Sequence, residues 1–208
     1  LVLTITGIAD DRLNLPAKLR LVIQLSCSLA VAHSGLRITS LQGYMGIYYI
    51  PVWAQYVLTV ILITGVTNAV NLADGIDGLA VSLTLTNLVV ISIFALLLDQ
   101  PEVAILLLAV TGGLVGFLKY NWRPARIFMG DGGSLPLGFM MSTVGIYLSE
   151  APIGHHKLLY ALPVVLFACF AVPVIDALRV FAGRMRKGKS PFAADKTHLH
   201  HKLLQHFM

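Results

Sequence analysis

Asparagines and aspartates recur at every third position in one stretch of an otherwise apolar chain. The stretch reads NAVNLADGIDGLA, and its polar side chains are Asn68, Asn71, Asp74 and Asp77. Residues three apart are neighbours on a helix surface, so the spacing predicts a polar strip along one side. Carboxylate and amide oxygens suit a hard cation such as Mg²⁺, and amides also pair with a base or a sugar. The structural alternative is two helix ends joined by an Asp-Gly turn, with asparagines that bond neighbouring helices.

Two adjacent carboxylates, Asp10 and Asp11, end the first apolar run and begin the loop ADDRLNLPAKLR. Adjacent carboxylates repel and lose hydration near lipid, so a bound Mg²⁺ would neutralise them favourably. Alternatively, the pair caps a helix, or binds Arg12 and Lys18 in water. The dipeptide alone leaves both interpretations open.

A glycine-rich turn, FMGDGGS, precedes a later apolar run at residues 128–134. Free backbone N–H groups and the helix dipole at such a turn favour an anion, and we expect a phosphate there. Asp131 lies in the middle of the turn and is compatible with a phosphate only if a divalent cation bridges the two. An ordinary helix N-cap role for Asp131 is the competing interpretation.

The C-terminal segment is dense in cations and imidazoles. Its candidate ligands are Arg184, Arg186, His198, His200 and His201. The histidine spacing matches no zinc enzyme, so we expect these side chains to bind a phosphate or pyrophosphate. A basic segment that touches anionic lipid is the alternative.

The composition is that of a membrane protein. The 208 residues are 57% hydrophobic and 12% charged, whereas soluble domains are about 45–50% apolar and about 25% charged. A helix that crosses a bilayer needs roughly 17–25 residues, which predicts an all-α, polytopic transmembrane bundle of about six full spans plus a partial N-terminal one. The expected spans are 19–36, 51–67, 79–98, 103–118, 133–149 and 158–180, and residues 1–9 form the end of another. We find no linker, so residues 1–208 form a single domain.

The basic residues orient this bundle. Counting spans places residues 10–18, 68–78, 119–132 and 181–208 on one side, and thirteen of the fifteen Lys and Arg lie on or next to it. Excess Lys and Arg mark the cytoplasmic face. Seven of the ten acids lie at the same helix ends. The net charge of +5 therefore follows from topology and from anionic lipid or phosphate partners, with no nucleic acid required.

Four motifs together resemble a known family. ADDRLNL, NAVNLADGIDGL, IFMGDGGS and SPFAADKTHLHHKLL occur in the order and spacing of the polyprenyl-phosphate N-acetylhexosamine-1-phosphate transferases, over essentially the whole chain. The THLHH form looks like the undecaprenyl-phosphate N-acetylglucosamine-1-phosphate transferase branch. Phospho-N-acetylmuramoyl-pentapeptide transferase is the alternative branch. The family has about ten or eleven spans, so the resemblance implies that the first ones are missing here. Asn14 also replaces the third acid of a DDxxD motif.

The resemblance implies a reaction at the cytoplasmic face of the bacterial inner membrane. A UDP-N-acetylhexosamine gives its sugar-1-phosphate to a polyprenyl phosphate, which releases UMP and forms a lipid-linked pyrophosphate sugar. The implied cofactor is Mg²⁺, or Mn²⁺ in its place, and a homodimer is compatible with the family. Which amino sugar is used, and the length of the polyprenol, are left open.

The resemblance also implies roles for the polar strip and the glycine-rich turn. Asp131 would be the principal Mg²⁺ ligand, with the Asn71 amide nearby. Asn68, Asp74 and Asp77 would line the nucleotide-sugar pocket.

The other motifs receive roles by the same resemblance. Asp10 and Asp11 would lie near the lipid phosphate, as metal partner or general base. The sugar or pyrophosphate would be gripped by Arg184, Arg186, His198, His200 and His201.

An ion-coupled transporter is the competing class. Such proteins keep acids near the bilayer midplane, on broken helices. The expected spans 79–98, 103–118 and 133–149 contain no charged residue, and the acids gather at one surface instead, which argues against transport. A non-catalytic scaffold is a third possibility that only an activity measurement separates.

Overall fold

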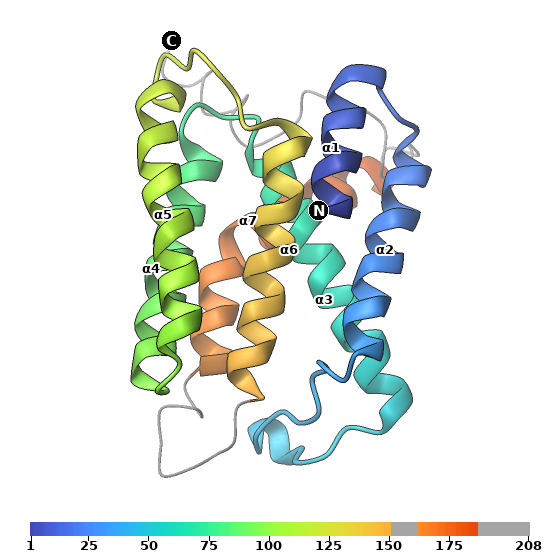
Figure 1. The fold of residues 1–208 in the computed structure, drawn as a ribbon. Helices are drawn as coiled ribbons and strands as arrows, with labels where there is room; N and C mark the ends of the chain where they lie inside the picture. The colour runs from blue at the N-terminus through green and yellow to red at the C-terminus, as the bar shows by residue number, and fades with distance from the viewer. Residues whose placement is uncertain (151–161, 187–208) are drawn as a thin grey trace.

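The computed structural model describes residues 1–150 and 162–186, and this part of the chain is all-α (Figure 1). A short 3₁₀ turn, Tyr44–Gly46, lies in the connection between the second and third helices. The seven α-helices are α1 Val2–Leu13, α2 Ala17–His33, α3 Val52–Ala73, α4 Leu79–Leu97, α5 Pro101–Asn121, α6 Gly130–Ser149 and α7 Leu162–Arg186. The predicted helical class is confirmed.

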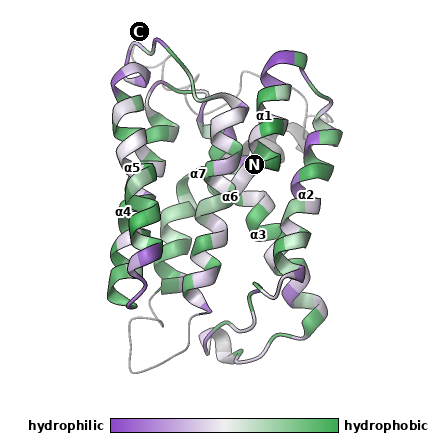
Figure 2. Ribbon diagram, in the orientation of Figure 1, coloured by the Kyte–Doolittle hydropathy of each residue, from purple (hydrophilic) through white to green (hydrophobic). Residues whose placement is uncertain are grey.

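Three helices, α3, α4 and α5, are long and apolar enough to cross a membrane. In Figure 2 the shafts of α4 and α5 are largely hydrophobic, and hydrophilic residues gather at the helix ends. The α2 helix is shorter, at 17 residues, and Lys18, Arg20 and Gln24 interrupt its apolar sequence. The described part of the chain therefore contains three clear spans where the sequence predicted about six.

The hydrophobic core lies where α4 packs against α5, α6 and α7. Its fully buried side chains include Leu88, Ile91, Leu107, Met141 and Leu148. Lipid tails are as apolar as these side chains, so close van der Waals packing is what stabilises the centre of a membrane bundle.

Glycines allow α6 to approach two other helices closely. A Cβ added at Gly138 would lie 2.8 Å from the Cα of Thr67 on α3. A Cβ at Gly7 on α1 would lie 2.2 Å from the backbone oxygen of Asp131, at the start of α6. No larger residue fits at these two contacts, and small residues at helix contacts are typical of membrane bundles. The second contact brings the end of α1 against the start of α6.

The connections at residues 10–18, 68–78 and 119–132 were predicted to lie on one side of the bundle, and this prediction is confirmed. Asp11 accepts backbone hydrogen bonds from residues 131 and 132, and Asp77 accepts one from Ala125. The end of α1 and the start of α6 lie at the upper end of the molecule in Figure 1. Thr39 and Glu150 bond each other at the opposite end.

Two helices extend further than their apolar runs. The α3 helix ends at Ala73 rather than near 67, so Asn68 and Asn71 are helical. The α1 helix ends at Leu13, which places Asp10 and Asp11 in its last turn and not in a loop. Asn14 follows as the C-cap with a left-handed backbone (φ 50°, ψ 63°), a conformation that asparagine adopts more readily than most residues. Asn14 therefore has a structural reason to be where it is.

Candidate functional site

One arginine on α2 connects carboxylates from two other helices. Arg20 Nη1 lies 2.5 Å from Asp10 Oδ2 on α1, and the same nitrogen forms an ion pair with Asp131 Oδ2 on α6. The three side chains are only 26%, 11% and 17% exposed, respectively. Partial burial strengthens the attraction between the charges and also makes any unbalanced charge costly.

The second oxygen of Asp131 faces α3. Asn71 Nδ2 donates to Asp131 Oδ1 over 2.6 Å and also lies 2.9 Å from Ser134 Oγ. The buried Ser134 hydroxyl donates to the Gly130 carbonyl over 2.7 Å. Asn71 and Asp131, the two predicted metal ligands, are therefore in direct contact, and they join α3 to α6.

Carboxylates from α1 and from the end of α3 occupy the N-terminus of α6. Asp11 accepts from the Asp131 N–H at 2.9 Å and from the Gly132 N–H at 3.0 Å, one bond to each carboxylate oxygen. Asp74 Oδ2 accepts from the Gly130 N–H at 2.8 Å. A negative charge at this position is favoured by the helix dipole as well as by the hydrogen bonds.

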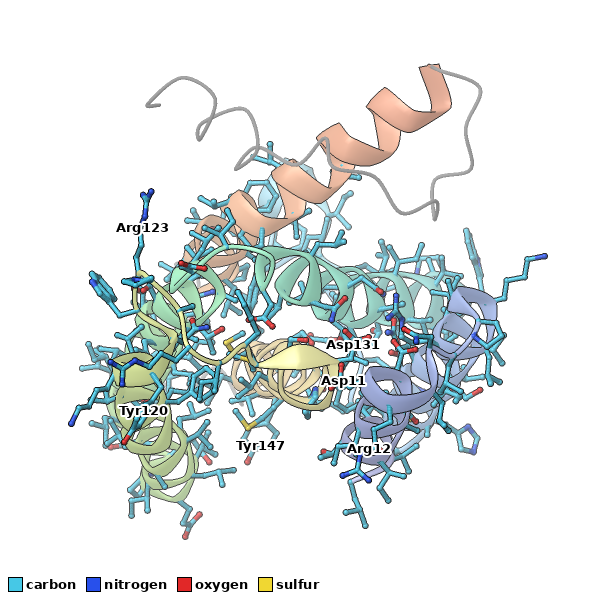
Figure 3. The ribbon with its side chains drawn as sticks, turned by 90° about the horizontal axis from the view of Figure 1, so that it is seen from above. Asp11, Arg12, Tyr120, Arg123, Asp131 and Tyr147 are labelled. Atoms are coloured by element: carbon cyan, nitrogen blue, oxygen red, sulfur yellow. The ribbon has the colours of Figure 1, made fainter. Side chains whose placement is uncertain are left out.

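The predictions made for the glycine-rich turn therefore need correction. The first N–H groups of α6 are not free for a phosphate, because the protein's own carboxylates take them. Asp131 is not the N-cap either: Met129 holds that position, and Asp131 lies in the first helical turn. The cap is supplied from another helix, by Asp11. Figure 3 shows Asp11 and Asp131 close together, with Arg12 of the same helix pointing away.

One carboxylate oxygen of Asp74, Oδ1, is buried and has no hydrogen-bond partner among the residues that the structure describes. Burial raises the pKa of Asp74 to about 6, against the opposing effect of the N–H groups of Gly130 and Met129, and the charges of Asp131 and Asp11 raise it further. A buried anion without a full set of partners favours a proton or a cation nearby.

The site as a whole holds surplus negative charge. Asp10, Asp11, Asp74 and Asp131 come together from three helices, and Arg20 is the one cation that forms an ion pair with any of them in the described residues. Hard oxygen donors of this kind are the ligands that Mg²⁺ takes.

Among the described residues, the protein's own carboxylates do not form a complete metal cage. In the ranges 1–150 and 162–186, no three His, Cys, Asp or Glu side chains approach one point closely enough to ligate a metal. Two features do fit a cation: the unpartnered oxygen of Asp74, and the point between Asp10 and Asp131 where Arg20 already places positive charge. The donor set therefore suits Mg²⁺ in its usual form, which takes one or two carboxylates and completes its shell with waters and substrate phosphates.

Asn68 lies one turn before Asn71 and faces α2. Its Nδ2 donates to Gln24 Oε1 and to the Thr64 carbonyl, the latter at 2.8 Å. Gln24 is 1% exposed, and its own Nε2 has no partner among the described residues. Asn68 thus joins two helices, as the structural interpretation of the strip predicted. Its role toward a nucleotide-sugar stays a prediction.

Asp77 lies beside the acidic cluster and not in it. Because α3 ends at Ala73, the three-residue spacing stops describing one helix face after Asp74. Asp77 Oδ2 accepts from the Ala125 N–H at 3.1 Å and so orders the connection that leads to α6. The predicted tail ligands His198, His200 and His201, and the side chains of Arg184 and Arg186, lie outside the described part of the structure.

The sequence motifs do not point to Arg20, the arginine that forms ion pairs with the carboxylates of the site. The charge pattern makes Arg20 one of thirteen basic residues on or next to the cytoplasmic side, and the motifs assign no role to Gln24. A signal existed: Arg20, Gln24 and Ser28 are four residues apart, which places three polar groups on one face of an otherwise apolar helix. Ser28 continues the polar contacts to Thr64 on α3, at 3.0 Å.

Comparison with known proteins adds a family to this geometry. The sequence profile of glycosyl transferase family 4 matches residues 1–149. The chain is 34% identical to the "Probable undecaprenyl-phosphate N-acetylglucosaminyl 1-phosphate transferase" of Bacillus subtilis, over 98% of this chain and 56% of the relative. It is 33% identical to a decaprenyl-phosphate N-acetylglucosaminephosphotransferase of Mycobacterium leprae, again over 98% of this chain and 56% of the relative.

A second group of relatives matches a shorter part. A phospho-N-acetylmuramoyl-pentapeptide-transferase of Clostridium beijerinckii is 47% identical over 104 residues, which is 50% of this chain and 30% of the relative. The chain thus spans about half the length, or less, of these curated relatives.

Proposed function

The chain belongs to glycosyl transferase family 4, and we propose that it transfers N-acetylhexosamine-1-phosphate from a UDP-sugar to undecaprenyl phosphate. The sugar we favour is N-acetylglucosamine, because the two relatives named for that sugar match nearly the whole chain. The pentapeptide-transferase relative matches half of it. The products are UMP and a lipid-linked pyrophosphate sugar. The protein is a multi-pass membrane protein, and we place the reaction at the cytoplasmic face of the bacterial inner membrane, in a bundle of about six full spans.

One observation carries this proposal: the four carboxylates gathered from α1, α3 and α6 at one end of the bundle. Phosphoryl transfer needs chiefly alignment and charge neutralisation. A diphosphate donor and a phosphate acceptor repel each other, so a site for them needs cations. Carboxylates that outnumber their ion-pairing cation four to one in the described residues are suited to hold such cations against the substrates.

The residues that would hold Mg²⁺, or Mn²⁺ in its place, are Asp131 and Asp10, with Asn71 and the free oxygen of Asp74 nearby. When bound, the ion supplies charge neutralisation to the phosphate oxygens and a fixed orientation for the displacement. Asn71 and Ser134 hold Asp131 in place, because they fix one of its oxygens to the helix framework.

Asp11 is better suited to position Asp131 than to act as a base. Both of its oxygens accept backbone N–H groups of α6, so the carboxylate is held against the helix and is not directed at a substrate hydroxyl or phosphate. A polyprenyl phosphate is already ionised near neutral pH, so the reaction needs little base catalysis. We therefore assign Asp11 to the geometry of α6 and Asp10 to the cation.

The substrate ligands outside the acidic cluster remain those predicted from the sequence. Asn68 and Asp77 border the cluster from α3 and from the turn after it. The basic and histidine-rich tail would bind the sugar or pyrophosphate through Arg184, Arg186, His198, His200 and His201.

A panel of UDP-sugars tests the proposal. The purified protein in lipid, with Mg²⁺ and undecaprenyl phosphate, is given each radiolabelled donor, and label is counted in the organic extract. We expect transfer from UDP-N-acetylglucosamine together with UMP release. Transfer only from the UDP-muramoyl-pentapeptide donor would move the chain to the other branch, and no transfer from any UDP-amino sugar would overturn the enzymatic proposal.

The transporter alternative has its own test. The α4 helix contains no charged residue, and the acidic cluster lies at the helix ends. Water accessibility of a cysteine placed at Asp74 is expected to match that of the connection around residues 123–126. A mid-bilayer depth for that cysteine would favour a transporter.

A further inference from the structure

Arg20 contacts its two carboxylates in an unusual way. Arginine commonly binds one carboxylate with two parallel N–H groups. Here the single nitrogen Nη1 contacts both Asp10 and Asp131, which come from different helices. The guanidinium thus acts as a point of positive charge between two anions, which is the place that a cation bridging the same two residues would take.

Both oxygens of Asp131 already have a donor. Asp131 Oδ2 faces Arg20, and Asp131 Oδ1 accepts from Asn71. A divalent cation on Oδ2 would lie against the guanidinium, and two positive charges in contact repel strongly in a half-buried site. Arg20 and a metal therefore exclude each other at this oxygen.

We propose that Arg20 is an internal counter-ion that competes with the divalent cation for Asp131 and is released to the substrate's phosphate groups when cation and substrate bind together. The release of Arg20 to phosphate groups rests on the proposed function. The competition for Asp131 is argued from the two ion pairs alone. In the absence of substrate, Arg20 limits the repulsion between Asp10 and Asp131 and keeps α1, α2 and α6 together at this end.

The position of Arg20 on its helix suits such an exchange. It lies in the first turn of α2, which begins at Ala17, and its side chain is 26% exposed. A guanidinium freed from Asp131 has a planar fork that matches a phosphate better than a single ammonium does. Because the two binding events share Arg20, the cation and the diphosphate should each raise the other's affinity.

The competition is tested with Mn²⁺ alone as the probe. Free Mn²⁺ is measured by electron paramagnetic resonance during titration of the wild-type protein, Arg20→Gln, Arg20→Lys and Arg12→Gln. Arg12 is the control, because it is an exposed arginine at the same end that points away from the cluster. We expect Arg20→Gln to bind Mn²⁺ at least about tenfold more tightly than wild type, a difference of about 1.4 kcal/mol.

Two results frame this expectation. Arg20→Lys keeps the positive charge at this position, so its Mn²⁺ affinity should stay within a few-fold of wild type. The control Arg12→Gln should also stay within a few-fold of wild type. Unchanged or weaker Mn²⁺ binding by Arg20→Gln, in protein that keeps its helical circular dichroism, overturns the competition. If Arg20→Gln does not fold, Arg20→Lys decides instead. Mn²⁺ binding by Arg20→Lys that is tighter than wild type by tenfold or more overturns the charge-based exclusion, and an affinity within a few-fold of wild type supports it.

The release step is tested by adding UDP-N-acetylglucosamine to the same titrations. In wild type the donor should tighten Mn²⁺ binding by about tenfold beyond any change seen in Arg20→Gln. An equal effect of the donor in both proteins would overturn the release of Arg20 to phosphate. Failure of the proposed function looks different: no sugar reaches the lipid in wild type, whatever the Mn²⁺ affinities are.

Discussion

The two ends of α6 each carry a carboxylate, and the protein treats them differently. At the C-terminal end, Glu150 accepts the Thr39 N–H at 3.0 Å on one oxygen and the Thr39 hydroxyl at 2.5 Å on the other. Neutral donors from a single residue therefore satisfy both oxygens. This carboxylate fastens the connection after α2 to the end of α6.

At the N-terminal end, Asp131 shares its surroundings with three further carboxylates. Arg20 pairs with Asp131 and with one of the three, Asp10. Asp11 is held by backbone N–H groups, and Asp74 keeps a buried oxygen without a partner in the described residues. Such an arrangement costs folding free energy unless a cation completes it. The comparison separates a carboxylate that serves the fold from a cluster that is held ready for binding.

The largest expected difference between the two ends of α6 appears when the carboxylate at each end is replaced by its neutral amide. We expect Asp131→Asn to lower transfer activity by about 100-fold or more, which is the size of effect seen when one group that stabilises transition-state charge is removed. Glu150→Gln, at the other end of the same helix, should retain activity within a few-fold. Label transferred to lipid and the melting temperature are measured for both variants.

Two outcomes would contradict the prediction for Asp131→Asn and Glu150→Gln. Full activity of Asp131→Asn at saturating Mg²⁺ would remove Asp131 from the metal role. A comparable loss in Glu150→Gln, at unchanged melting temperature, would mean that the two ends of α6 do not differ in function.

Added bulk at the two ends should also have unequal effects. Gly7→Ala places a methyl group 2.2 Å from the Asp131 backbone oxygen, so α1 must move away from α6, and we expect a loss of about 1–3 kcal/mol in unfolding free energy. Gly145→Ala meets only the side-chain end of Leu166, at 3.1 Å, which has freedom to move. Denaturant unfolding in detergent measures both, and equal losses would contradict the tight approach of α1.

Removing the cap supplied by Asp11 tests positioning against base catalysis. Asp11→Ala should lower the unfolding free energy by about 1 kcal/mol, as the loss of a helix N-cap usually does. Asp11→Asn keeps an acceptor oxygen and should retain most of that stability and activity within about tenfold of wild type. Activity of Asp11→Asn as low as that of Asp131→Asn would instead support the general-base role.

Asp74→Asn should have the smallest effect, and its sign depends on pH. The folded-state pKa of about 6 lies above the unfolded value of 3.8, so the contribution of Asp74 to stability is fully present below about pH 3.8 and is lost as pH rises through about 6. Without divalent cations, Asp74→Asn should therefore melt a few degrees higher than wild type at pH 7.5 and near wild type at about pH 3.5. A lower melting temperature at pH 7.5 would contradict surplus charge at this end.

Apolar run length predicted the simpler helices well. The expected span 79–98 differs from α4, Leu79–Leu97, by one residue, because Gly78 and Asp99 bound the run sharply. For α3 the same criterion stopped about six residues early, since Asn68 and Asn71 are polar by composition but bond within the bundle. Polar side chains that face other helices extend a helix without adding to its hydropathy.

The site was predicted as a set of residues and not as a network. The resemblance brought Asn71 and Asp131 together, and they are in contact at 2.6 Å. The partnership of Arg20 with Asp131 joins residues 111 positions apart. The spacing of Arg20, Gln24 and Ser28 marks a polar face of α2, but it does not report which helix that face meets. The glycine-rich turn predicts free N–H groups at the start of α6. Asp11 takes two of them, and this contact between distant residues is visible only in the packed structure.

The most direct test locates the cation. Crystals of the protein grown with Mn²⁺ and UDP would give the ion's position by anomalous scattering. The account predicts a peak about 2.0–2.3 Å from a carboxylate oxygen of Asp131, with Arg20 no longer on that oxygen. A peak elsewhere with the Arg20–Asp131 ion pair intact, or only near Glu150, would contradict it.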